Sequence, residues 1–244
     1  MKRFSYAFAV LMSTALFATA CGGSDALVLC TDAPYPPMEM EIDGEFTGFD
    51  IELMRAIADE LGRDLEVNNI GFDPITSGLA MESGECEIAA ASITITEERE
   101  ANIDFSDPYF TADQSLLVAA DSGIANLAGF AGKNLGVQTG TTGEMYANEN
   151  DPGATIISFE NPGDIFTALA AGEIEGVLQD IVPNAEYALN NPGDALLVET
   201  FPTDESYGLA VKEEGSEDLL ADVNEALATL RANGTYDKIY DDWF

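Results

Sequence analysis

Asp107-Pro108-Tyr109-Phe110-Thr111 is the stretch of sequence that decides the fold. This extended segment leaves one group of alternating strands and helices and enters a second group. Residues 202–207 return just before an apolar run at residues 208–211. A chain that crosses twice forms one discontinuous lobe and one inserted lobe, with a cleft between them. We therefore predict an α/β protein with two lobes and two hinge crossings, which suits the capture of a small molecule.

The two lobes take up most of the chain. Lobe 1 is predicted to comprise residues 27–109 and 208–244, and lobe 2, with the hinge segments, residues 110–207. Short apolar runs predict strands at residues 27–31, 65–70, 87–92, 115–120, 134–138, 176–179 and 207–211.

Helices are predicted between these strands. Apolar residues recur every four positions from Phe49 to Leu61, and Gly62 follows as a stop signal. Asp73-Pro74 predicts an N-cap and a first-turn proline for a helix that carries Ile75 and Leu79. An apolar stripe over residues 219–230, followed by a glycine, predicts the last long helix.

The composition excludes several classes of function. The 244 residues include 45 Asp and Glu but only 9 Lys and Arg, so the net charge is −36. Nucleic acid is excluded as a partner, because its phosphates would be repelled. The chain has no histidine, so Ser-His and Cys-His nucleophiles and histidine metal sites are absent. The acids are spread along the chain, which indicates a solvated acidic shell and leads us to hypothesise a salt-loving source organism.

The N-terminus reads as a targeting segment. Lys2 and Arg3 precede an apolar stretch at residues 8–18, so residues 1–20 are predicted to be a signal peptide. Residues 18–24, Ala-Thr-Ala-Cys-Gly-Gly-Ser, resemble a bacterial lipobox, in which Cys21 is lipidated and residues 21–26 form a tether. The alternative is ordinary cleavage. No later run reaches the length of a membrane span, so the lipid would be the only contact with a membrane.

Two cysteines remain after export, Cys30 and Cys86. An exported protein can form disulfides. Both residues nevertheless lie in or beside apolar, strand-like runs rather than in loops. This placement favours two buried free thiols, with a disulfide as the alternative.

Four motifs resemble the family 3 extracellular solute-binding proteins, which are the polar amino-acid binding proteins of ABC importers and have the periplasmic-binding-protein type II fold. In chain order these motifs are Tyr35-Pro36-Pro37-Met38-Glu39 with Gly48-Phe49-Asp50; residues 92–99, Ser-Ile-Thr-Ile-Thr-Glu-Glu-Arg, with residues 104–109; residues 132–142, which end in Gly140-Thr141-Thr142; and residues 234–244. The resemblance covers essentially the whole mature chain.

The resemblance implies a clamp for the carboxylate of an amino acid. Arg99 would bind it, since a guanidinium matches a carboxylate with two parallel hydrogen bonds. The alternative is an ion pair of Arg99 with an acidic neighbour. Thr94, at the exit of the strand 87–92, would complete the carboxylate's shell with its N–H group and hydroxyl, and Ser92 would face the same cleft. Thr141 and Thr142 open a helix whose N–H groups can bind an anion, or they are a plain N-cap.

The remaining candidate residues would bind the ammonium group and the side chain. Asp180 follows the strand 176–179, where open α/β sheets place ligands, and the resemblance assigns it the α-ammonium group. The alternative is one more acid in the shell. Tyr35 and Phe72 resemble aromatic walls around the ligand side chain, although either could be ordinary core. Asp32, Gln138 and Gln179, together with Glu39, would set selectivity for a polar or basic side chain.

These residues predict an exported, lipid-anchored binding protein on the outer face of the cytoplasmic membrane or in the periplasm. It would be a monomer that presents a free amino acid to ABC permease subunits, without metal or cofactor. One alternative is an enzyme of the cyclohexadienyl or prephenate dehydratase type, with Glu39 or Asp32 as general acid. The other is a ligand-sensing domain without transport.

Overall fold

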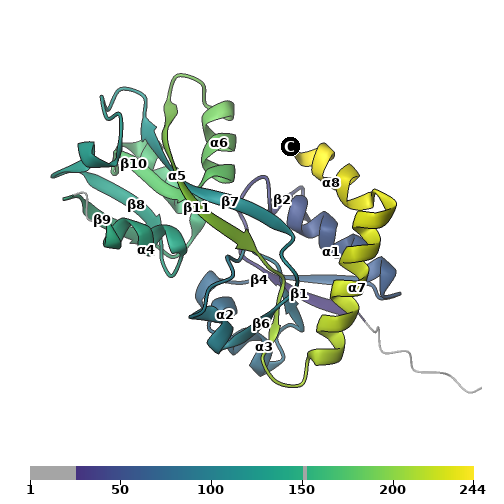
Figure 1. Cartoon of the computed structure of the whole chain (residues 1–244). Coiled ribbons are helices and arrows are strands. Elements are labelled where there is room, and N and C mark those ends of the chain that lie inside the picture. The colour runs from purple at the N-terminus through teal and green to yellow at the C-terminus, as the bar shows by residue number, and fades with distance from the viewer. Residues whose placement is uncertain (1–25, 151–152) are drawn as a thin grey trace, which may run out of the picture.

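The protein consists of two five-stranded sheets, each covered by helices on both faces, in a computed structural model that describes residues 26–150 and 153–244 (Figure 1). The predicted signal peptide, Cys21 and most of the predicted tether lie outside the described residues. None of the helices in the described part of the chain is long and apolar enough to cross a bilayer.

The first sheet has the strand order β4-β1-β5-β12-β6. Its strands are Leu65–Asn69, Leu27–Thr31, Ile88–Ala89, Ala210–Lys212 and Ile103–Phe105 in that order. Helices α1 (Phe49–Glu60) and α7 (Glu217–Asn233) bury one face, and α2 (Phe72–Thr76) with α3 (Leu79–Ser83) the other. The hairpin of β2 (Met40–Ile42) and β3 (Glu45–Thr47) and helix α8 (Thr235–Trp243) complete this lobe.

The second sheet has the order β11-β7-β10-β8-β9. Its strands are Ala195–Tyr207, Phe110–Ala119, Gly176–Asp180, Asn134–Gln138 and Thr155–Phe159. Helix α4 (Thr142–Glu149) packs on one face, and α5 (Pro162–Ala171) and α6 (Ile181–Asn190) pack on the other.

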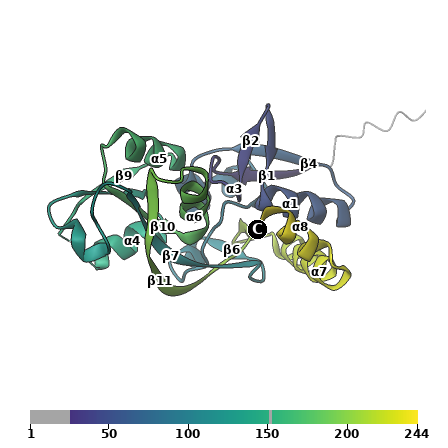
Figure 2. The ribbon, with the colours of Figure 1, turned by 90° about the horizontal axis from the view of Figure 1, so that it is seen from above.

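Strand β7 begins at the first crossing between the lobes, and strand β11 ends at the second (Figures 1 and 2). They pair antiparallel, with Phe110 opposite Tyr207 and Thr111 opposite Ser206. The chain passes from β6 to β7 at the first crossing and from β11 to β12 at the second. The predicted two-lobed α/β fold with two crossings is confirmed. The residue-level lobe boundaries stay a prediction.

Two predicted helices match the structure closely. Helix α1 buries Phe49, Leu53 and Ile57, and Leu61 is its C-cap. Helix α7 ends at Gly234, whose φ of 81° is the left-handed conformation that glycine adopts without steric cost.

The prediction of one helix after Asp73-Pro74 is wrong. Helix α2 begins at Phe72, so Asp73 lies inside its first turn, and Leu79 begins the separate helix α3. Gly78 divides them with φ of 80°, and a Cβ atom there would lie 2.7 Å from the carbonyl oxygen of Asn102. This close approach to a neighbouring segment ends the first helix, which residue spacing alone does not show.

The strand predictions find several strands and miss others, both apolar and polar. The predicted strand at 207–211 is divided, because β11 ends at Tyr207 and β12 begins at Ala210. Strands β2, β3, β6 and β9 and nearly all of β11 were not predicted. The second half of β11, Thr200–Tyr207, is rich in polar residues and pairs with β7 through irregular register.

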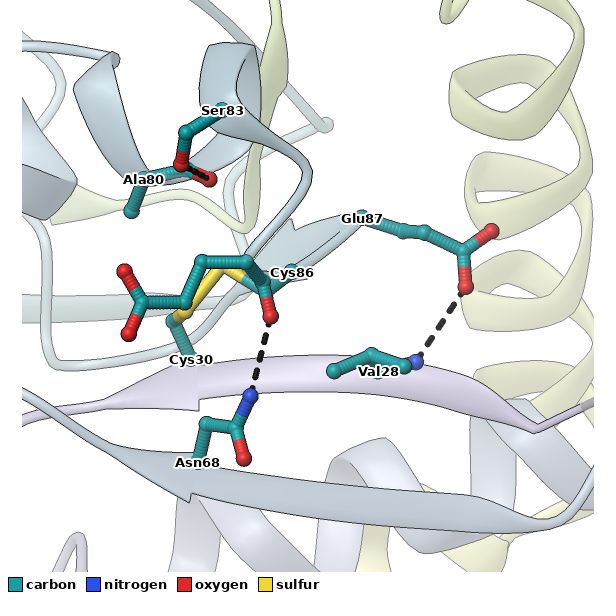
Figure 3. Close-up of a disulfide and its surroundings, with 8 residues drawn as sticks. Val28, Cys30, Asn68, Ala80, Ser83, Cys86 and Glu87 are labelled. Carbon is teal, nitrogen blue, oxygen red and sulfur yellow. Dashed lines mark hydrogen bonds between the residues drawn. A yellow bond between two sulfur atoms is a disulfide. The ribbon is translucent and has the colours of Figure 1, made fainter.

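The two cysteines form a disulfide, so the expectation of two free thiols is wrong (Figure 3). Cys30 lies in β1, which pairs in parallel with β5, and Cys86 lies just before β5. Strand pairing brings their Cα atoms to 5.7 Å, within the range that a disulfide requires. The residues are 56 positions apart, and only the order of strands in the sheet reveals their proximity.

Candidate functional site: a cavity between the lobes

A cavity between the two lobes is lined by all eleven residues that the sequence singled out for ligand binding. They are Asp32, Tyr35, Phe72, Ser92, Thr94, Arg99, Gln138, Thr141, Thr142, Gln179 and Asp180, and Glu39, Ala91 and Gly143 join them. The cavity measures about 20 Å³, which is room for about one water molecule. The structure is therefore closed, and a ligand as large as an amino acid needs the lobes to separate before it can enter.

Arg99 is a buried cation without an anionic partner. It opens a 3₁₀ turn, Arg99–Ala101, and only 4% of its surface is exposed. Its Nη1 donates to the carbonyl of Thr94 at 2.7 Å, and its Nη2 donates across the cleft to the carbonyl of Gly140 at 3.1 Å. Across residues 26–150 and 153–244, no carboxylate oxygen lies within 4 Å of this guanidinium. Burial consequently lowers its pKa, although Asp180 and Glu205 partly offset this effect.

Asp180 is a buried carboxylate held by neutral donors. It is the last residue of β10, and its Oδ2 accepts from the hydroxyls of Tyr35 at 3.1 Å and Tyr207 at 2.5 Å. Its Oδ1 accepts from Nε2 of Gln114 at 2.5 Å. Burial raises the pKa of Asp180 to about 6, against the opposing effect of these hydrogen bonds. Arg99 and Asp180 therefore present opposite charges to the same cavity, and they attract each other without forming a direct ion pair.

Asp32 and Gln138 meet across the cleft. Asp32 follows β1, and its Oδ2 accepts from Nε2 of Gln138, the last residue of β8, at 2.7 Å. Burial raises the pKa of Asp32 to about 7, and the bond from Gln138 opposes the shift. Gln179 is also buried, and its amide donates to Asn184 at 3.0 Å. Polar groups thus surround this end of the cavity.

Thr141 differs in its partners from Thr94 and Thr142, which share one. Thr141 is the N-cap of α4, and its hydroxyl accepts from the N–H of Glu144 while the residue also lines the cavity. The hydroxyl of Thr94 in lobe 1 lies 3.5 Å from that of Thr142 in lobe 2. Both hydroxyls donate to the carboxylate of Glu205.

The two aromatic candidates differ in their contacts. The ring of Phe72 lies under the guanidinium of Arg99, with 5.1 Å between the guanidinium carbon and the ring centroid. A cation stacked on a ring in this way is stabilised by the ring's quadrupole. Tyr35 uses its hydroxyl on Asp180. Both rings are buried and line the cavity. Phe72 contacts the guanidinium of Arg99, and Tyr35 contacts the carboxylate of Asp180.

Two further buried carboxyls are Glu39, which lines the cavity, and Asp50, which contacts the cavity residue Ser92. Asp50 accepts from the N–H of Ser92 at 2.9 Å and from the hydroxyl of Tyr109 at 2.8 Å, and burial raises its pKa to about 7. Ser92 itself has a φ of 49°. Glu39 is 1% exposed, and burial and then the neighbouring Asp50 raise its pKa well above the ordinary value. The unliganded site is consequently rich in acid.

Sequence reasoning missed three residues that organise the site. Gln114 and Tyr207 hold Asp180, and Glu205 holds the two threonines. They come from β7 and β11 near the crossings, where no motif marks them. The pairing of β7 with β10 sets Gln114 opposite Asp180, and the pairing of β11 with β7 brings Glu205 and Tyr207 close to the cavity-lining residues.

In the part of the chain that the structure describes, no group of three or more His, Cys, Asp or Glu side chains is placed around a common metal position.

Comparisons with known proteins agree with the two-lobed fold. The ABC transporter glutamine-binding protein GlnH of Bacillus subtilis is 37% identical over 82% of this chain and 73% of its own. An ancestral arginine-binding protein bound to glutamine has a TM-score of 0.83 and 39% identity, covering 90% of this chain and 97% of its own. The ancestral amino acid-binding protein AncCDT-1, a precursor of cyclohexadienyl dehydratase, has a TM-score of 0.80 and 36% identity over 90% and 95%. The model of the bacterial extracellular solute-binding proteins, family 3, matches residues 27–244, and the chain belongs to this family.

Proposed function

We propose that this protein is the substrate-binding lipoprotein of an amino-acid ABC importer and that it binds a polar or basic L-amino acid of the glutamine, arginine or lysine type. The amino acid would lie in the cavity between the lobes, and the closed form would be presented to the permease. No cofactor or metal takes part in this function.

The observation that carries the proposal is a pair of opposite charges in one cavity that make no direct ion pair. A buried guanidinium and a buried carboxylate that lack a directly bonded counterion are each costly in free energy. A free amino acid supplies a carboxylate for Arg99 and an ammonium group for Asp180. Its binding would satisfy both groups at once.

Closure of the lobes supplies the mechanism. Arg99 belongs to the predicted lobe 1 and Asp180 to lobe 2, so an open form offers the ligand only one of the two groups at a time. A ligand that contacts both shifts the population toward the closed form by its differential affinity. Strands β7 and β11, next to the crossings, are where such a motion would bend the chain.

The side-chain class follows from the far end of the cavity. Asp32, Gln138 and Gln179 can satisfy an amide or a guanidinium, whereas a hydrocarbon side chain placed between Asp32 and Gln138 would break their hydrogen bond and offer no replacement. Two relatives support the same class, since GlnH is a glutamine-binding protein and the ancestral arginine-binding protein is bound to glutamine.

The proposed location rests on the N-terminal sequence. Lys2, Arg3 and the apolar stretch after them support export, and the motif around Cys21 supports a lipid anchor. Mass spectrometry of the mature protein from its host would show a diacylglyceryl cysteine at residue 21. An unmodified Cys21 would contradict the anchor but leave the binding function untouched.

Replacement of Arg99 tests the proposed function. Arg99→Ala should abolish binding of the cognate amino acid, because a charge-assisted bidentate pair in a closed cleft contributes roughly 3 kcal/mol or more. Arg99→Lys should also bind weakly, since an ammonium group cannot form the two parallel bonds. Isothermal titration calorimetry with each of the twenty amino acids measures both effects.

The control for this experiment is Lys238→Ala, which removes an exposed cation on α8. It should bind as the wild type does. An Arg99→Ala variant that keeps full affinity would remove Arg99 from the site, and a wild type that binds no amino acid would refute the proposed function.

An enzyme is the second candidate, because Asp32 is a cavity carboxyl with a pKa of about 7 and one structural neighbour is a precursor of a dehydratase. A general acid with such a pKa could protonate a leaving hydroxyl group. Incubation with prephenate, followed by absorbance of the aromatic product, tests this activity. Turnover that Asp32→Asn removes would favour the enzyme over the binding protein.

A further inference from the structure

Glu205 lies between the two lobes and touches both. It is a half-buried residue near the end of β11, just after an irregularity in the pairing of β11 with β7. Its Oε2 accepts from the hydroxyl of Thr94 in lobe 1 at 2.9 Å and from that of Thr142 in lobe 2 at 2.6 Å. One carboxylate oxygen therefore joins the lobes at the point where the chain crosses between them.

The hydrogen bonds of Glu205 fix the orientation of both hydroxyls. An ionised carboxylate oxygen only accepts hydrogen bonds, and a threonine hydroxyl has a single hydrogen. The hydroxyls of Thr94 and Thr142 therefore both donate their single hydrogen to Glu205. The oxygen of Thr142 also accepts from the amide of Gln114 at 3.2 Å. The Thr94 hydroxyl was expected to donate to a ligand carboxylate, but in this arrangement its hydrogen is already used.

Glu205 acts from behind the cavity. Thr94 and Thr142 line the cavity and Glu205 does not. Nε2 of Gln114 lies 3.3 Å from Glu205 and 2.5 Å from Asp180, so one amide group bridges the two acids. The charge of Glu205 also acts on Arg99 and Asp180. A substitution of Glu205 would consequently change ligand affinity only through the residues that Glu205 contacts.

We propose that Glu205 is a positioning residue for ligand binding. It holds Thr94 of one lobe against Thr142 of the other. This contact keeps the lobes in the closed arrangement, in which Arg99 and Asp180 lie around one cavity. This inference rests on the proposed function. Separation of the lobes moves Thr94 away from Thr142 and breaks at least one of the two bonds, and closure forms it again. Part of the closed form's stability then comes from the hinge strand rather than from the ligand.

A double-mutant cycle tests the role of Glu205. Glu205→Ala, Thr142→Val and the double variant are titrated with L-arginine and L-glutamine by calorimetry. Because hydrogen bonds to a charged group are strong, Glu205→Ala should weaken the affinity for the amino acid that the wild type binds by about tenfold or more. The same change in the Thr142→Val background should cost at least about threefold less, since the hydroxyl that Glu205 holds is already gone.

Two further variants control the cycle. Glu205→Gln keeps the size and one acceptor oxygen, so it should bind better than Glu205→Ala but worse than the wild type, and it replaces Glu205→Ala in the cycle if the alanine variant does not fold. Glu66→Ala removes an exposed acid on β4 and should leave affinity unchanged. A general loss of negative charge or of the fold would not produce this order of affinities, with Glu205→Gln between the wild type and Glu205→Ala and with Glu66→Ala unchanged.

The outcomes separate the inference from the function on which it rests. Binding by the wild type together with unchanged affinity of Glu205→Ala overturns the positioning role, and so do losses that add within about twofold in the cycle. A wild type that binds neither probe nor any other amino acid overturns the proposed function and this role with it.

Discussion

Asp32 is the side chain that most directly distinguishes a cationic from a neutral ligand. It is 5% exposed, and its only hydrogen-bond donor in the described part of the chain is the neutral amide of Gln138. A guanidinium or ammonium group would provide a charged partner, whereas an amide would provide only a neutral one. The carboxylate therefore favours the cation by the strength of a charge-assisted pair.

Asp32→Asn is expected to lower the affinity for L-arginine far more than the affinity for L-glutamine. Only the cation loses a charge partner, and a charged hydrogen bond exceeds a neutral one by about 1 kcal/mol or more, so the ratio of affinities should shift by about tenfold. Competition titrations with arginine, lysine, glutamine, glutamate and leucine measure this ratio. Equal losses for arginine and glutamine would show that Asp32 does not read charge, and tightest binding of leucine or glutamate would refute the pocket assignment.

The buried carboxyls predict how stability depends on pH. Burial raises the pKa of Asp32 and Asp50 to about 7 and that of Asp180 to about 6, against about 3.9 in an unfolded chain. The folded state therefore binds more protons than the unfolded state between these values. The stability from these groups is fully present below about pH 4 and is lost as the pH rises toward 7.

We expect the melting temperature of the unliganded protein to fall between pH 5 and pH 8. Asp32→Asn should show a smaller fall, because an amide does not titrate. Calorimetry in 1 M NaCl, where the Debye length is about 3 Å, suppresses the contribution of the surface acids. Glu66→Gln, at an exposed position, serves as the control, and a melting temperature that rises over this range would contradict the raised pKa values.

At the scale of elements, the ends of strands from both lobes build the site. Asp32 follows β1 in one lobe, and Gln138 and Asp180 end β8 and β10 in the other. Parallel strands bring the residues at their carboxyl ends to one edge of the sheet. The two edges face each other, so the bonds from Gln138 to Asp32 and from Tyr35 to Asp180 cross the cleft.

The disulfide is expected to stabilise the first sheet and to leave the site intact. It closes a loop of 56 residues, for which loop-closure entropy gives about 4 kcal/mol as an upper figure. Replacing both Cys30 and Cys86 by alanine should lower the free energy of unfolding by about 2 to 4 kcal/mol in urea titrations. Ligand affinity should change little, because neither cysteine lines the cavity.

Reduction of the wild type supplies the matched control for the disulfide. Dithiothreitol should shift the wild-type urea midpoint toward that of the double variant and should leave the variant unchanged. A wild type whose midpoint does not respond to the reductant would mean that the two thiols are free in solution.

At the scale of the whole molecule, charge is the dominant feature. The formal net charge is −36, and the ion pairs in the described part of the chain, such as Arg63 with Glu87 at 2.7 Å, are on the surface. Exposed ion pairs contribute little, so they do not offset the mutual repulsion of the acids. Mobile ions must screen this repulsion.

We expect the melting temperature to rise as NaCl increases from low to molar concentration. Screening removes self-repulsion of the folded state, which is more compact than the unfolded chain. Differential scanning calorimetry at pH 7 follows the effect. A melting temperature that stays flat or falls with NaCl concentration below 1 M would contradict the hypothesis of a salt-loving source organism.

The sequence by itself determined the two-lobed α/β architecture, helices α1 and α7, and the residues that line the cavity. Hydrophobic periodicity is local, and the motif that contains Thr94 and Arg99 is contiguous, so both signals can be recognised in the linear sequence. The prediction of separate strands and of a cleft between two crossings needed no knowledge of side-chain contacts.

Only the tertiary structure decided how the distant segments pair. The disulfide between Cys30 and Cys86 depends on β1 lying beside β5, and the break at Gly78 depends on the nearby carbonyl of Asn102. Glu205 reaches the two threonines because β11 pairs with β7 next to the crossings. Each of these contacts joins residues far apart in the chain, and their proximity follows from the register and order of strands, which no local pattern of residues encodes.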